Sequence, residues 1–189
     1  MKLLTLILVS CSLTAAGQTP FRAFESYENL IEGGRVHTLV LESGREHLVT
    51  RVPKDYGVTV ESETKSVVLR ESAGTISITI RMTTNSPGVL PDDNALRASA
   101  LAADAGGAFL QIAGCATGYR PARFVDSVRS LDPKRAFRTR HAFVACPEGM
   151  VEFVFSSKDE AFDKGRVVFN LFLSSFRLEM IQQPVKVEE

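Results

Sequence analysis

The chain has 189 residues with 22 Lys and Arg against 22 Asp and Glu, so its formal net charge is zero, and it contains no Trp. A molecule without net charge has no general attraction for nucleic acid or an anionic membrane, which excludes both as partners unless a local patch supplies the charge. The lack of Trp argues against an aromatic platform for stacking sugars or bases.

Residues 1–17 have the plan of a secretory signal peptide. Lys2 precedes an apolar run from Leu3 to Val9, which is too short for a membrane-spanning helix of about 20 residues. Two processing routes remain open. Cleavage near Gly17 would release a soluble periplasmic or secreted protein. Alternatively, Leu8-Val9-Ser10-Cys11 resembles a bacterial lipobox, in which residues 1–10 are removed and Cys11 becomes a lipid anchor and the sole contact with a membrane.

The remaining residues, roughly 170, make one domain of ordinary size. Residues 18–34 are predicted to form a loosely packed N-terminal arm with a short helix around Ser26 to Ile31. Residues 35–180 form the domain, and residues 181–189 a flexible tail.

The first part of the domain has the pattern of antiparallel strands. Residues 36–41 and 47–52 flank a turn that contains Gly44, and further strands are predicted at 57–61, 66–70 and 75–82. In the last of these, Ile76, Ile78 and Ile80 alternate with polar residues, which is typical of a strand with one buried face.

Two amphipathic helices interrupt and close this pattern. Asp92 and the acidic residue after it cap a helix that runs to about Ala105, and strands follow at 109–116, 123–129, 136–146 and 150–155. Ser157-Lys-Asp-Glu160 predicts a capping box at the start of a helix with regularly spaced apolar residues from Phe162 to Phe176. Because each helix has one apolar stripe to bury on a sheet, the sequence predicts a layered α+β domain.

The element order resembles the PsbP-like proteins. The resemblance covers about residues 45 to 178, and it lies in the corner Val52-Pro53-Lys-Asp-Tyr56-Gly57, the strand Ile76 to Ile80, the hairpin Cys146-Pro-Glu-Gly-Met150 and the helix Phe169 to Phe176 with its end at Arg177. It implies an antiparallel sheet covered by two helices in an α/β/α sandwich. It also implies an accessory that docks onto partners and has no catalytic role, although fold alone is poor ground for function.

Cys115 and Cys146 are the two cysteines outside the leader and its lipobox. In an oxidising compartment they are candidates for a disulfide, which would stabilise the fold by roughly 3–4 kcal/mol. The alternative is two separately buried thiols that act as small apolar residues. The chain has no CxxC motif, which argues against a redox-catalytic role.

Arginines are concentrated between residues 119 and 141. Arg120, Arg123, Arg138 and Arg140 are candidates for a surface that receives an anionic partner, because a guanidinium group matches the geometry of carboxylate and phosphate. The alternative is an ordinary solvated strand face, which the alternation of Arg138 and Arg140 favours.

No residue pattern indicates an enzyme or a cofactor. His37, His47 and His141 are on different predicted strands without the spacing of metal ligands, and the motifs of hydrolases, zinc proteases and nucleotide-binding loops are absent. We therefore expect an exported non-enzymatic accessory or binding protein with a protein or envelope component as partner. The alternatives are a small-molecule or metal-binding enzyme whose site has no sequence motif, and a structural envelope lipoprotein.

Overall fold

A computed structural model describes residues 22–43, 46–61, 63–83, 88–130, 136–147 and 149–180. The signal peptide, Cys11, residues 18–21 and the tail at 181–189 lie outside these residues. The described elements, in chain order, are β1 (Arg22–Asn29), β2 (Arg35–Ser43), β3 (Glu46–Arg51), β4 (Tyr56–Glu61), β5 (Ser66–Glu71), β6 (Ile76–Thr83), α1 (Asp93–Ala103), β7 (Ala108–Cys115), β8 (Ala122–Ser130), β9 (Ala136–Cys146), β10 (Gly149–Lys158), α2 (Asp159–Ser175) and β11 (Arg177–Met180).

The strands form two antiparallel sheets. The larger has the order β4-β5-β6-β10-β9-β8-β7, and the smaller has the order β1-β2-β3-β11. The two predicted halves of the domain join where β10 pairs with β6, so that Phe153 lies opposite Ile80 and Phe155 opposite Ile78. Strand β11, the last described element, joins the small sheet next to β3, where Arg177 pairs with Val49.

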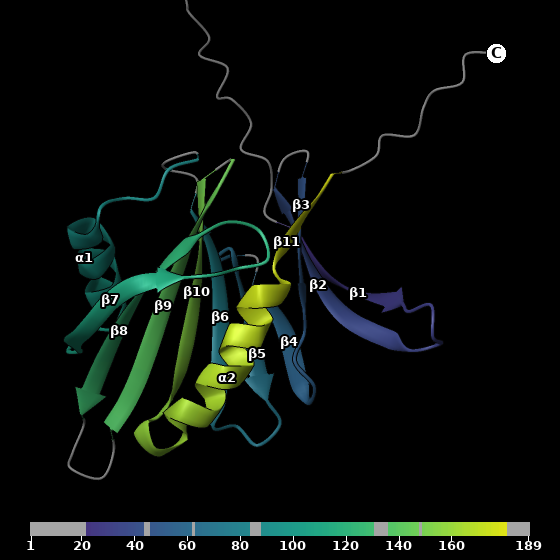
Figure 1. Cartoon of the computed structure of the whole chain (residues 1–189). Coiled ribbons are helices and arrows are strands. Elements are labelled where there is room, and N and C mark those ends of the chain that lie inside the picture. Colours follow the sequence, from purple (N-terminus) through teal and green to yellow (C-terminus); the bar gives the residue numbers. More distant parts are fainter. Residues whose placement is uncertain are drawn as a thin grey trace, which may run out of the picture.

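Helix α2 covers one face of the large sheet (Figure 1). The predicted stripe Ile76, Ile78 and Ile80 is buried in this core together with aromatic side chains of β10 and α2. Phe155 packs on Phe162 at 5.2 Å and on Phe169 at 5.3 Å between ring centroids. This layer buries most of the large apolar side chains, and it fixes α2 on the sheet.

Helix α1 covers the opposite face, near the β7 edge. Leu96 and Ala100 pack on Val125 and Phe143, whose neighbours along β8 and β9 point to the α2 side. The side chain of Asp92 caps the helix, as predicted, by accepting a hydrogen bond from the backbone N–H of Ala95 at 2.9 Å. The predicted α+β class, with a helix on each face of an antiparallel sheet, is confirmed.

Two local predictions are wrong. Residues 22–29 form strand β1, so the helix predicted around Ser26 to Ile31 is absent. The whole of β1 pairs with β2, and this pairing gives the backbone hydrogen-bond partners that a single isolated turn of helix lacks. Ser157 is not a helix cap, because β10 continues through Lys158 and the Ser157 hydroxyl donates to the Lys158 carbonyl. Helix α2 begins at Asp159 with no side-chain cap.

Candidate functional site

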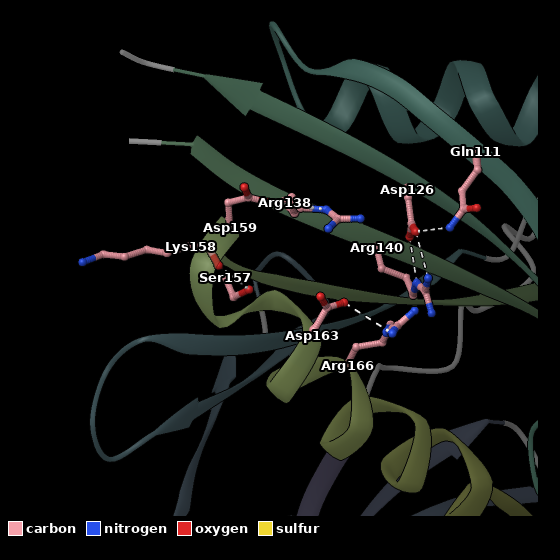
Figure 2. Close-up of polar contacts among 9 residues, drawn as sticks. All are labelled: Gln111, Asp126, Arg138, Arg140, Ser157, Lys158, Asp159, Asp163 and Arg166. Carbon is pink, nitrogen blue, oxygen red and sulfur yellow. Dashed lines mark hydrogen bonds and ion pairs between the residues drawn. The ribbon is translucent and has the colours of Figure 1, made fainter. Parts of the chain in front are cut away.

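Arg140 is buried and cannot face a partner. Its guanidinium group donates two hydrogen bonds to the Asp126 carboxylate, at 2.7 and 2.8 Å, and lies 3.8 Å from the centre of the Phe124 ring. Gln111 donates to the same carboxylate at 2.7 Å. Figure 2 shows Asp126 between Gln111 and Arg140. Only 5% of Arg140 is exposed, so this side chain belongs to neither a solvated strand face nor an anion-binding surface.

The other three arginines do not share a surface. Arg138 lies 4.1 Å above the Phe162 ring on the α2 side of the sheet, with its Nε 3.7 Å from Asp159 (Figure 2). Arg123 is bonded to Asp93 of α1, on the opposite side. Arg120 is exposed in the β7–β8 connection and stacks on Tyr119. The four candidate residues are therefore dispersed, and three of them have carboxylate partners.

Cys115 and Cys146 are not bonded to each other. Cys115 pairs with Ala122 of β8, and Ala122 pairs with Val144 of β9, two residues before Cys146. One strand thus separates the two cysteines, and Cys146 lies two residues further along its strand, so their Cα atoms are about 12 Å apart. A disulfide needs Cα atoms about 4.4–6.8 Å apart, so the candidate disulfide is not formed in this structure, and the two thiols are separate.

The three histidines lie in different places, and each is next to a glutamate. His37 bonds to Glu25 at 2.7 Å, and His141, which is buried, bonds to Glu152 at 2.8 Å through Nδ1. The ring of His47 lies 3.8 Å from Glu42. Among the residues that the structure describes, no group of three or more His, Cys, Asp and Glu side chains could hold a metal ion.

A cavity of about 770 Å³ lies between the β3–β4 corner and the C-terminal half of α2. We call it the corner cavity. The corner supplies one side, α2 supplies the other, and Gly118 reaches it from the β7–β8 connection. Its lining residues are Arg51, Val52, Pro53, Lys54, Tyr56, Glu71, Gly118, Val168, Leu171, Phe172, Ser174, Ser175 and Arg177.

Polar contacts hold the two sides of the corner cavity together. The Ser175 hydroxyl accepts a hydrogen bond from the backbone N–H of Arg51 at 2.9 Å, and the Thr50 hydroxyl lies 2.9 Å from the same oxygen. Gly118 donates to the Leu173 carbonyl, and a Cβ atom at position 118 would lie 2.4 Å from the Ser174 carbonyl oxygen. The cavity is therefore built from segments that are fixed to one another.

Tyr56 is the buried polar residue of this cavity. Its hydroxyl is shielded from solvent and has no hydrogen-bond partner within the described part of the chain. Burial, together with the nearby charge of Glu71, raises the pKa of Tyr56 to about 12. The phenol is therefore protonated at neutral pH.

The charged residues around the cavity differ in their partners. Arg177 is bonded to Glu28 and lies 2.8 Å from Glu179. Arg51 and Lys54 are exposed, and neither side chain forms an ion pair with any residue that the structure describes. The cavity thus combines apolar walls, a buried phenol and two cations without described partners.

The sequence does not predict this site. In the sequence, the corner from Val52 to Gly57 stands out only through a family resemblance, and α2 only as a helix with one buried stripe. Two apolar residues outside the buried stripe, Val167 and Leu171, are the sequence feature that points to this site. They are 59% and 68% exposed in the structure.

No family model matches the sequence, and no curated protein matches it. Among solved structures, the chain is similar to cyanobacterial PsbP (CyanoP) from Synechocystis sp. PCC 6803, with 12% identity, a TM-score of 0.46, and coverage of 91% of this chain and 99% of the other. It is also similar to LpqN of Mycobacterium tuberculosis, which is involved in cell envelope biogenesis, with 10% identity, a TM-score of 0.49, and coverage of 82% and 91%.

A PsbP is thus among the solved structures that this chain resembles, as the sequence predicted, and at these identities the similarity concerns the fold alone. In the described part of the chain, no helix has the length and apolar character to cross a membrane.

Proposed function

We propose that the protein is an exported, non-enzymatic accessory that docks onto a protein partner at the corner cavity. The leader supports export to the periplasm or the medium. Processing near Gly17 would release the protein, and lipidation at Cys11 would tether it to a membrane close to envelope partners. Either route leaves the cavity available to a partner outside the cytoplasm.

The observation that supports a protein partner is the open wall formed by α2. Leu171 lines the cavity although 68% of it is exposed, and Val167 continues the apolar surface one turn away on the outside of the helix. A small ligand usually lies inside its cavity, which encloses most of the ligand surface. Such a ligand would leave Val167, which lies outside the cavity, in water. A protein segment can fill the cavity and cover Val167 as well.

Site-specific photocrosslinking in cells of the native host tests this proposal. A benzophenone amino acid is placed at Leu171 and, as a control, at Val89, which is equally exposed at 68% but precedes α1 on the other side of the sheet. We expect one discrete crosslinked protein from position 171 and none from position 89. The absence of a product at 171, or the same products at both positions, would contradict docking at the corner cavity.

A further inference from the structure

We infer that the segment bound in the corner cavity carries a carboxylate beside a large apolar side chain. This inference rests on the proposed function, because it specifies the chemistry of the partner. It has two components, which are the apolar walls and the two cations at the β3–β4 corner.

The walls select an apolar side chain. Val52 and Pro53 form one side, and Val168, Leu171 and Phe172 form the other. A Leu or Phe side chain that fills such a space gains affinity because its apolar surface leaves water. Because hydrogen bonds at Arg51 and Ser175 already hold the two sides in place, binding does not need to order them first.

The cations select a negative charge next to that side chain. Arg51 and Lys54 line the cavity three residues apart, and no described residue neutralises either of them. Glu71 is the one acidic side chain among the lining residues that the structure describes, and its carboxylate accepts a hydrogen bond from Thr75 at 2.6 Å. Arg177 adds little, because two glutamates already pair with it. The remaining charge therefore favours a carboxylate at the corner.

A fatty acid would present the same two groups, but the exposed wall favours a peptide segment. An acyl chain within the cavity would leave Val167 in water, whereas a folded or extended protein segment covers it. Dodecanoate therefore serves as the competing ligand in the test.

The test begins with selection of random nonapeptides displayed on phage against the mature protein. We expect enrichment of peptides with Asp or Glu adjacent to a large apolar residue. Synthetic versions of one enriched peptide, with its acidic residue or with the corresponding amide, are then titrated by fluorescence anisotropy. The amide should bind about tenfold more weakly to the wild-type protein, as expected for one lost charge-assisted contact.

A double variant, Arg51→Gln with Lys54→Gln, should bind both peptides equally and weakly. The matched control, Lys65→Gln with Lys158→Gln, removes two exposed cations away from the cavity and should keep the tenfold difference; Figure 2 shows Lys158 directed away from the sheet. Leu171→Asp should abolish binding of both peptides.

Peptides enriched without an acidic residue, or equal binding of acid and amide, would overturn the inference. So would binding of dodecanoate with no enriched peptide, which would mark the cavity as a lipid site. Failure of the inference is separable from failure of the proposed function. If crosslinking from position 171 persists in the Arg51→Gln, Lys54→Gln variant, the partner docks at the cavity without a carboxylate.

Discussion

Tyr56 lies directly opposite Glu71 in the β4–β5 pair, so the two side chains share one face of the sheet. Burial of the phenol and the charge of Glu71 raise the pKa of Tyr56 from 10.0 to about 12. The unfolded chain therefore releases this proton at a lower pH than the folded protein does. The corresponding stability is complete below pH 10 and is lost between about pH 10 and pH 12.

Unfolding in urea at about pH 9 to 11.5 measures this effect, with Tyr56→Phe as the variant that cannot ionise. The free energy of unfolding of the wild type should fall relative to that of Tyr56→Phe as the pH rises, by no more than about 2.7 kcal/mol for two pKa units. Below about pH 9 the variant should be as stable as the wild type or more stable, because it removes a hydroxyl with no hydrogen bond to a described residue. Parallel pH profiles for the two proteins would contradict the assigned pKa.

Local pattern was enough to predict the elements that carry the core. The alternation at Ile76, Ile78 and Ile80 predicted a strand with one buried face, and all three are buried against α2. The acidic residue Asp92 predicted the start of α1. These features depend on neighbours in sequence, which is why the sequence alone identifies them.

Features that depend on distant pairing could not be predicted in this way. Arg140 is buried because the register of β8 and β9 places Asp126 directly opposite it, and no pattern within β9 reveals that register. The strand order likewise places β8 between Cys115 on β7 and Cys146 on β9, which the spacing of the cysteines in the sequence does not reveal. The corner cavity needs the β3–β4 corner, α2 and Gly118 to meet, although they are far apart in the sequence.

The buried pair of Arg140 and Asp126 predicts a large cost for removing one partner. Asp126→Leu leaves the guanidinium charge buried without its carboxylate, and we expect a loss of about 3–5 kcal/mol in the free energy of unfolding. The double variant Asp126→Leu, Arg140→Met should regain most of that loss, because neither buried charge remains. Urea denaturation monitored by circular dichroism gives both values.

Arg123→Met is the matched control for this pair. It breaks a more exposed ion pair with Asp93 on the other side of the sheet and should cost less than about 1 kcal/mol. Equal losses in Arg123→Met and Asp126→Leu would mean that the Arg140–Asp126 pair is more exposed than the 5% accessibility of Arg140 indicates.

The two cysteines should differ in their reaction with maleimide. Cys146 is buried and should remain unlabelled until the protein is denatured, whereas Cys115 is partly exposed and should react in the native state. Its reaction should be slow, because burial raises the pKa of the Cys115 thiol and reduces the thiolate fraction. Intact mass before and after denaturation counts the adducts. A loss of two hydrogens in mass, reversed by reductant, would instead show a disulfide.

Gly165→Ala in α2 should destabilise the protein, although Gly→Ala substitutions in helices usually stabilise. Replacement of a helical glycine by alanine ordinarily stabilises a protein by about 1 kcal/mol. A Cβ atom at position 165, however, would lie 2.7 Å from Cζ of Phe155 and 3.0 Å from Cδ1 of Ile76. Phe155 cannot move aside, because Phe162 and Phe169 of the same helix as Gly165 pack against its ring. Overpacking of a core costs about 1–3 kcal/mol.

We therefore expect Gly165→Ala to lower the free energy of unfolding, whereas Lys164→Ala, at the adjacent exposed position, should leave it nearly unchanged. Urea denaturation of the two variants under the same conditions measures the difference. Because α2 also carries Val168 and Leu171, displacement of the helix by the added methyl group should reduce crosslinking from position 171 as well. A stabilised Gly165→Ala variant would show that α2 is not held as closely against β6 and β10 as Gly165 allows.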